Sequence, residues 1–280
     1  MNNRFGRQES FFGKEGQAKI KNVRVNIIGI GGVGSHIIQQ LAFLGVGNIT
    51  VIDEDLLEGS NKNRLIGVKY SDNCGTPKIN IAERTIKEID PDINVIKMKG
   101  SVISKESFKC LLNTDYIFGC VDNDGARLFL NEVALAYNIG YFDVSSEILI
   151  SENEYGGHII FINGDNPCLY CLNEINPAEA RKYLDNPNAR KDEEAIYGID
   201  KKVLNGSGPA VVSLNGIIAS LAVNEFMLHV TGKRVANKFL TYYGSIGIVR
   251  KRNENRKEGC YYCESIKGQR EKVDISNYFT

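Results

Sequence analysis

The stretch NVRVNIIGIGGVGSHIIQQLAFLGVGNITVIDEDLL, residues 22–57, decides the fold. It opens with a short β-rich run from Arg24 to Ile28. A glycine turn separates that run from Ser35 to Leu44, whose apolar residues recur at helical spacing. Asn48 to Ile52 has the composition of a second strand, and the acid Asp53 follows it directly. A strand, a glycine turn, a helix and a strand in this order predict the first unit of a parallel sheet.

The same alternation continues along the chain. We expect a helix from Lys78 to Ile89, a strand from Asn94 to Met98, and a nearly all-apolar strand from Tyr116 to Val121. A further helix is predicted from Arg127 to Asn138 and a further strand from Gly140 to Val144. This alternation predicts an α/β fold with a doubly wound, mostly parallel, Rossmann-like sheet. Ligands of such sheets bind beyond the carboxyl ends of the strands.

The pattern changes after about Ile148. Strand-like pieces then predict an antiparallel region in the C-terminal half, at His158 to Ile162, Phe239 to Tyr243 and Ile246 to Arg250. Between these pieces, residues 173–206 are polar and rich in charged and turn residues, so we expect a mobile surface excursion there.

Composition excludes several classes of function. Lys and Arg (34) balance Asp and Glu (34), so there is no basic field that would recruit nucleic acid or an anionic membrane. The N-terminal residues MNNRFGRQESFFGKEG lack the apolar core of a signal peptide, and we therefore expect a cytoplasmic protein. The apolar segment from Ala210 to Val230 is long enough to span a bilayer, but its polar residues make a buried helix the better prediction; they are Asn215, Asn224, Glu225 and His229.

The glycine turn predicts a phosphate-bearing ligand. Gly29, Gly31 and Gly34 match G-x-G-x-x-G between a strand and a helix, and Asp53 ends the next strand. Such glycines let backbone amides approach phosphate, while an acid at that position accepts hydrogen bonds from ribose hydroxyls. The motif by itself does not choose between NAD and ATP.

Cationic residues after the second strand favour ATP. The segment SNKNRL contains Asn61 and Arg64, and Lys78 lies in GTPK at a helix start. A triphosphate needs several such donors, and Asp122 could hold the magnesium ion that offsets its remaining charge. The alternative, an NAD-dependent oxidoreductase, would leave the two cations and Asp122 without a role.

Four of the seven cysteines form two pairs, CLYC and CYYC. Two CxxC pairs supply the four thiolates of a tetrahedral structural zinc site, with Cys168, Cys171, Cys260 and Cys263 as ligands. Buried or redox-active cysteines are the alternative. A zinc site of this kind is closed, so we assign it no catalysis and expect it to tie the late strand region to the C-terminal tail.

Taken together, these motifs resemble the MoeB/ThiF-type adenylating enzymes, which are relatives of the ubiquitin-activating enzymes. The resemblance covers most of the chain, and its motifs occur in the family's order: RFGRQ, GIGGVGS, DEDLLEGSNKNR, GTPK, CVDNDGAR, both CxxC pairs and GPAVVSLNGIIASLAVNEF. It implies one adenylation domain over residues 1–280, with a nucleotide-binding half at 1–150 and a substrate- and zinc-binding half at 151–280. It also implies that the C-terminus of a small ubiquitin-like or sulfur-carrier protein, or of a peptide, attacks the α-phosphate of ATP.

The resemblance further implies roles for individual residues. Gly31, Gly32 and Gly34 would approach the nucleotide and Asp53 would hold the ribose. The phosphates would be bound by Asn61, Arg64 and Lys78, and magnesium by Asp122. Arg7 matches an arginine that such enzymes lend to the ATP of a neighbouring subunit, which implies a homodimer.

The chain departs from the thioester-forming members of that family. Those members carry a cysteine shortly before the GP of the long apolar helix, but residues 199–208 (IDKKVLNGSG) contain none. We therefore expect an acyl adenylate without an enzyme-bound thioester, with Cys74, in the loop DNCGTPK, as the one outside candidate. A thioester-forming enzyme and a catalytically silent scaffold remain alternatives.

Because the attacking carboxylate is already ionised, no side-chain base is required, and we expect structural roles for the three histidines.

Overall fold

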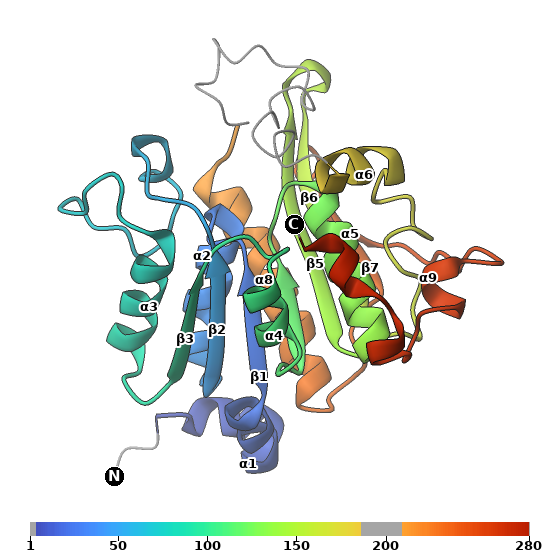
Figure 1. The fold of residues 1–280 in the computed structure, drawn as a ribbon. Coiled ribbons are helices and arrows are strands. Elements are labelled where there is room, and N and C mark those ends of the chain that lie inside the picture. Colours follow the sequence, from blue (N-terminus) through green and yellow to red (C-terminus); the bar gives the residue numbers. More distant parts are fainter. Residues whose placement is uncertain (1–3, 186–208, 280) are drawn as a thin grey trace.

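One continuous sheet forms the centre of the molecule (Figure 1). The computed structural model describes residues 4–185 and 209–279. Its eight-stranded sheet has the order β3-β2-β1-β4-β5-β6-β7-β8. The first five strands in sequence pair in parallel; they are β1 (Arg24–Ile28), β2 (Asn48–Asp53), β3 (Asn94–Lys99), β4 (Tyr116–Gly119) and β5 (Gly140–Leu149). The predicted parallel sheet is confirmed.

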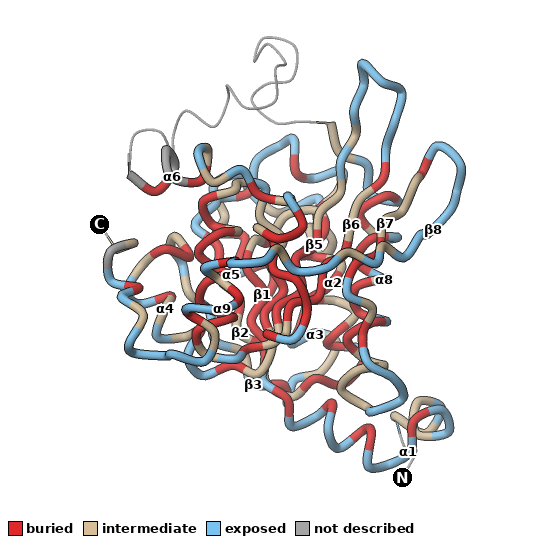
Figure 2. Tube along the Cα trace, turned by 90° about the vertical axis from the view of Figure 1, so that its right-hand side faces the viewer, coloured by how far each residue is buried: buried red, intermediate tan, exposed pale blue. Residues whose placement is uncertain are grey.

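Helices cover both faces of this sheet. On one face, α2 (Gly32–Leu44), α3 (Lys78–Ile89) and α8 (Val212–Val230) contribute to a single apolar core. On the other face, α4 (Lys105–Leu111) and α5 (Asp124–Tyr137) share a second core with the cysteine-rich region. The buried strands lie between the two cores, as the red tube in Figure 2 shows. The fold is therefore doubly wound, as predicted.

The C-terminal strands are antiparallel, again as predicted. They are β6 (Glu154–Ile162), β7 (Phe239–Tyr243) and β8 (Ile248–Lys251). Strands β5 and β6 are longer than the sequence indicated. The polar residues SSE of β5 and the residues EYGG of β6 carry no clear apolar signal, but the two strands still pair from Ser145↔His158 to Leu149↔Glu154. Near the base of this hairpin the rings of Phe142 and Phe161 stack, with their centroids 4.5 Å apart.

The remaining helices surround the sheet. The first is α1 (Gly6–Asn22), at the end where β1 begins (Figure 1). The others are α6 (Pro177–Asp185), α9 (Tyr261–Glu264), and the 3-10 turns η1 (Gly59–Asn61), η2 (Ile150–Glu152), η5 (Arg270–Lys272) and η6 (Ile275–Tyr278). Helix α6 occupies part of the predicted excursion at 173–206, and the residues from 186 onward lie outside the described ranges.

Helix α8 is the long apolar segment, and it packs in the core as predicted. Its buried carboxylate Glu225 is paired with Arg234 at 2.5 and 2.7 Å and accepts a hydrogen bond from the backbone of Asn237 at 2.8 Å. Within the described residues, none of the helices is long and apolar enough to cross a membrane.

Candidate functional site

The glycine turn between β1 and α2 lies at the carboxyl edge of the sheet. Gly29 has φ +86°, and a Cβ there would lie 2.6 Å from the carbonyl oxygen of Cys120. A Cβ at Gly34 would lie 2.0 Å from the carbonyl oxygen of Gly29. Gly31, by contrast, faces open space and precedes α2 without any side-chain cap. The amides of the first turn of α2 therefore have no side-chain cap, and the helix dipole at this end favours an anion.

Asp53 ends β2 beside this turn and is 9% exposed. Its carboxylate accepts a hydrogen bond from the amide of Ile30 and another from that of Asp55 at 2.7 Å. Burial raises the pKa of Asp53 to about 6, although the charge of Lys78 acts in the opposite direction. The carboxylate is thus fixed by backbone donors and can accept bonds from hydroxyl groups of a ligand.

Lys78 lies next to this acid at the start of α3. Its ammonium contacts Asp55 at 2.7 Å, its backbone amide donates to the carbonyl of Asp55 at 3.1 Å, and its side chain is 10% exposed. The structure therefore brings the predicted lysine to the edge that holds Asp53 and the glycine turn. In the structure the charge of its ammonium is balanced by the carboxylate of Asp55.

The SNKNRL segment docks on the first turn of α2. The amide of Ile66 donates to the hydroxyl of Ser35 at 3.0 Å, which joins the two parts of the chain. Asn61 is buried, and its side chain accepts a hydrogen bond from the amide of Glu58 at 3.0 Å. The guanidinium of Arg64 donates to the carbonyl of Ser60. Phosphate binding by Asn61 and Arg64 stays a prediction, but both lie on a segment anchored beside the glycine turn.

Asp122 follows β4, the strand next to β1. The amide of Cys120 donates to the carbonyl of Ile28 at 2.8 Å, so the end of β4 stays aligned with the start of the glycine turn. Asp122 is exposed, and Asn123 caps α5 by accepting a hydrogen bond from the amide of Ala126 at 2.7 Å. An exposed carboxylate at this edge suits a magnesium ligand.

A buried polar network that we did not predict lies behind this edge. Arg127, in the motif CVDNDGAR, holds Asp143 through two hydrogen bonds of 3.1 and 2.7 Å. The hydroxyl of Tyr141 donates to the same carboxylate at 2.7 Å. The charge of Arg127 holds the pKa of the fully buried Asp143 carboxyl well below its usual range, against the opposing effect of burial. One signal in the sequence pointed here: Asp143 interrupts an apolar run, and a buried carboxylate must be paired.

The network brings a serine, a histidine and an aspartate together, which the sequence did not suggest. The Oγ of Ser145 lies 3.1 Å from Nε2 and 3.3 Å from Nδ1 of His158, and Asp143 lies 3.2 Å from the same Nε2. A nucleophilic triad requires the serine and the acid on opposite ring nitrogens. Here the Oγ of Ser145 lies at nearly the same distance from both ring nitrogens, and the nearer one is the Nε2 that Asp143 also contacts. Asp143 is, in addition, already held by Arg127. The structural role expected for His158 is consistent with this geometry.

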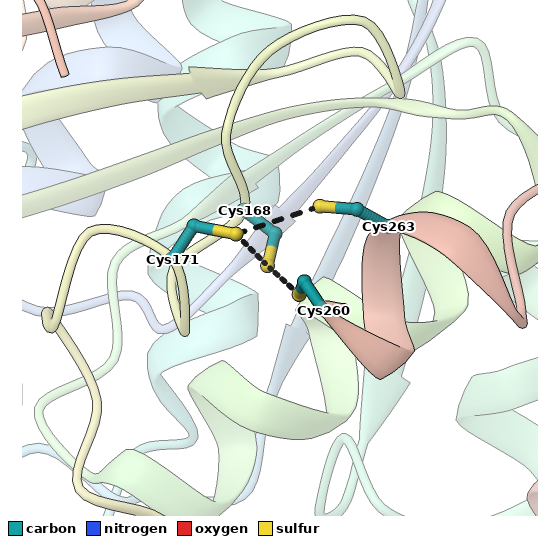
Figure 3. A group of neighbouring side chains, drawn as sticks. All are labelled: Cys168, Cys171, Cys260 and Cys263. Atoms are coloured by element: carbon teal, nitrogen blue, oxygen red, sulfur yellow. Dashed lines mark hydrogen bonds between the residues drawn. The ribbon is translucent and has the colours of Figure 1, made fainter. Parts of the chain in front are cut away.

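The four paired cysteines converge, as Figure 3 shows. Cys168 and Cys171 come from the turn after β6, Cys260 is the N-cap residue of α9 and Cys263 lies within α9. Their sulfur atoms all lie within 4.8 Å of one another. Three of the Sγ–Sγ distances are 3.7 Å. Zinc–sulfur bonds of about 2.3 Å in a tetrahedron separate the sulfurs by about 3.8 Å. The four buried thiols therefore fit a structural zinc ion, and the backbone amide of Lys257 donates to the sulfur of Cys171 at 3.3 Å.

Arg7 does not lie at the same edge. It is exposed on α1, and α1 contacts the far end of α2, where Gln8 donates to the carbonyl of Phe43 at 3.2 Å. The 13-residue helix α2 is about 20 Å long, so Arg7 is about that far from the glycine turn of its own chain. Any role for Arg7 in nucleotide binding requires a second subunit.

The other cysteines give no site. Cys74 is exposed in a turn. Cys110 and Cys120 are partly buried, and burial raises the pKa of both thiols, that of Cys120 well above the usual range. The position before the GP motif, at 199–208, lies outside the described residues, so the expected absence of a catalytic cysteine rests on the sequence alone.

A cavity of about 580 Å³ lies at the opposite edge of the sheet, where β4 and β5 begin. It is lined by residues that include Tyr116, Tyr137 and Asp115. Arg24 already pairs with Asp115 at 2.7 and 3.2 Å. None of the predicted nucleotide ligands lines this cavity, and α/β sheets bind ligands at the other edge, so we do not assign the nucleotide to it.

Known proteins share both the sequence pattern and the fold. The profile of the ThiF family matches residues 5–264. Ubiquitin-like modifier-activating enzyme 5 of Aedes aegypti is 28% identical over 240 residues, which are 80% of this chain and 54% of that protein. The adenylyltransferase and sulfurtransferase UBA4 of Saccharomyces cerevisiae is 33% identical over 177 residues, 62% of this chain and 39% of that protein. The chain thus spans about half the length, or less, of these curated relatives.

Solved structures show the same architecture. Escherichia coli MccB, solved with ATP, has a TM-score of 0.70 at 19% identity, over 94% of this chain and 75% of that one. PaaA has a TM-score of 0.68 at 19% identity, over 89% of this chain and 82% of that one. Because the family profile covers nearly the whole sequence, the chain belongs to the ThiF family.

Proposed function

We propose that this chain is an ATP-dependent adenylyltransferase. It would activate the C-terminal carboxylate of a small ubiquitin-like or sulfur-carrier protein, or of a peptide, as an acyl adenylate. The observation that carries the proposal is the convergence of the uncapped α2 N-terminus, the buried acid Asp53 and Lys78 at one edge of a ThiF-family sheet. The relatives are named as modifier-activating and adenylyltransferase enzymes, which supports the same reaction.

The proposed chemistry needs charge compensation more than proton transfer. A carboxylate oxygen of the substrate forms a bond to the α-phosphorus of ATP, and the bond to the pyrophosphate oxygen breaks. Charge then builds on pyrophosphate. Lys78 and Arg64 would offset it, and the α2 amides would bind the phosphates. Asp53 would hold the ribose and so fix the α-phosphate near the carboxyl edge.

Two metal ions complete the proposal. Asp122 would hold magnesium, which when bound neutralises part of the phosphate charge. Zinc would be structural, since all four positions of a Cys168, Cys171, Cys260 and Cys263 site are filled by thiolates. The buried Arg127 and Asp143 pair would support the site by joining α5 to β5 behind Asp122.

We also propose a homodimer in which Arg7 reaches the ATP of the partner subunit. The argument from this chain is geometric: α1 lies at the far end of α2 from its own glycine turn. Phe11 and Phe43 are 54% and 56% exposed on α1 and α2, a pair of large apolar side chains that a second subunit could cover.

No enzyme-bound thioester is part of the proposal. The only exposed cysteine among the described residues is Cys74, and residues 199–208 contain none. An NAD-dependent oxidoreductase is disfavoured because the chain belongs to the ThiF family and Lys78 lies beside Asp53.

Exchange of labelled pyrophosphate into ATP tests the function. The purified chain should catalyse exchange in the presence of the right member of a panel of carrier proteins and peptides that differ in their C-terminal residues. Amidation of that C-terminus should abolish exchange, because the nucleophile is then lost. A rise in melting temperature with NADH but not with ATP and magnesium would refute the proposal. A thioester to Cys74, seen by mass spectrometry without reducing agent, would refute the thiol-free route.

A further inference from the structure

A buried asparagine touches the phosphate-binding turn from the other half of the chain. Asn215 lies in the first turn of α8 and is 2% exposed. A Cβ built on Gly32, the first residue of α2, would lie 2.0 Å from its Nδ2. Gly32 is not one of the three glycines of the G-x-G-x-x-G motif. Glycine is nevertheless required at this position, because any side chain would collide with the amide of Asn215.

The orientation of this amide is fixed. The hydroxyl of Ser146 in β5 donates to Oδ1 of Asn215 at 2.8 Å. With the oxygen end held by Ser146, the donor end of the amide faces the backbone of Gly32. Three elements, α2, α8 and β5, therefore meet through one side chain.

A polar side chain at this position needs an explanation. The neighbouring apolar residues of α8, Leu214 and Ile218, are buried in the core. An apolar residue at position 215 would fill the same space at a lower desolvation cost than asparagine. The side-chain amide of Asn215 instead places a hydrogen-bond donor beside the uncapped N-terminus of α2, and it brings no negative charge there. It does so next to Gly31, which faces open space.

We propose that Asn215 is a positioning residue for ATP, which it serves by holding the first turn of α2 in its phosphate-binding conformation. This inference rests on the proposed adenylation function. In this way α8, which belongs to the C-terminal half of the chain, directly supports the glycine turn between β1 and α2. Affinity for ATP then depends on a contact between the two halves of the chain.

Substitutions at Asn215 separate this role from simple packing. Asn215→Ala should raise the KM for ATP in pyrophosphate exchange about tenfold and leave kcat within about twofold, because one buried hydrogen-bonding group is lost. Asn215→Asp keeps the shape but places a carboxylate beside the triphosphate, so its KM should rise about a further tenfold. Ser220→Ala is the matched control. It removes another polar α2–α8 contact, the 3.1 Å bond from Gln40, and should leave both constants unchanged.

The contact itself is tested by compensation. Gly32→Ala should abolish detectable binding of a non-hydrolysable ATP analogue and lower the melting temperature, since the new methyl group would meet the amide. Adding Asn215→Ala removes the obstructing atom, so it should restore the melting temperature and bring binding back to the level of the Asn215→Ala single variant. Failure of this rescue, or equal KM values for Asn215→Asp and Asn215→Ala, would overturn the inference. If the unmodified chain binds no ATP, the proposed function fails instead, and this positioning role fails with it.

Discussion

At the scale of single residues, Asp53 is a buried carboxylate at the edge of the sheet where we propose that the nucleotide binds. Its folded-state pKa of about 6 lies above the ordinary value of 3.8, because the carboxylate is buried. The burial cost of its charge is therefore fully present above pH 6 and is relieved as pH falls through 6 towards 4. Protonation that relieves this cost would also remove the charged acceptor that we propose for the ribose hydroxyls.

We predict that ATP binding weakens on acidification because Asp53 is protonated. The rise in melting temperature that ATP produces should shrink as pH falls from 7.5 to 5, with a loss of affinity of at most about tenfold per pH unit below 6. Thermal shift at a series of pH values measures this. ATP itself titrates in the same range, so Asp53→Asn supplies the baseline. If the variant shows the same pH profile as the unmodified chain, Asp53 is not the titrating group.

Asp122 allows a second prediction at this scale. Asp122→Ala should reduce pyrophosphate exchange by about 100-fold or more, because the magnesium ion proposed to neutralise the phosphates would lose its protein ligand. The melting temperature should change little, since Asp122 is exposed. Asp92→Ala, an exposed acid just before β3, is the control and should exchange normally. Exchange that survives Asp122→Ala at saturating magnesium would remove Asp122 from the metal site.

At the scale of elements, α1 makes the dimer prediction testable. Arg7→Ala and Lys78→Ala chains should each be inactive as homodimers. Coexpressed with different tags, they should form mixed dimers in which one of the two sites has both residues, which recovers about half of the normal number of sites. Pyrophosphate exchange of the doubly purified mixed dimer measures this. No activity in that sample would place Arg7 outside the partner's site, or show that the chain acts alone.

The elements also show what could be predicted from the sequence. Helix α3 matches its predicted bounds, and β1, β2 and β7 match to within a residue, because apolar periodicity and flanking turns mark them. The glycine turn and the cysteine cluster were predictable for a different reason, because short sequence spacings between the glycines and within each CxxC pair fix their local geometry. The pairing of Arg127 with Asp143 was not predictable, since it depends on which strands become neighbours. Helices α1 and α4 were missed, as α1 has few apolar residues and α4 spans only seven.

At the scale of the whole molecule, the cysteine cluster ties the C-terminal residues to the sheet. We predict one bound zinc ion per chain by elemental analysis. Cys260→Ser should lose this zinc and lower the melting temperature by about 10 °C, since several kcal/mol of metal-linked stability are lost. Cys74→Ser, at an exposed cysteine outside the cluster, should keep both the zinc and the melting temperature. Full retention of zinc in Cys260→Ser would remove this residue from the ligand set.

The hairpin of β5 and β6 has a consequence for how the chain can be divided. Nine residue pairs join the two strands, and α8 from beyond the hairpin covers the same sheet face as α2. A protease cut at the tip, near Ile150, would therefore leave two fragments, and each would expose a large apolar surface that is complementary to the other fragment. The two fragments should remain associated in solution after the cut. Two genes that encode the fragments separately should likewise give a folded protein only when both are expressed.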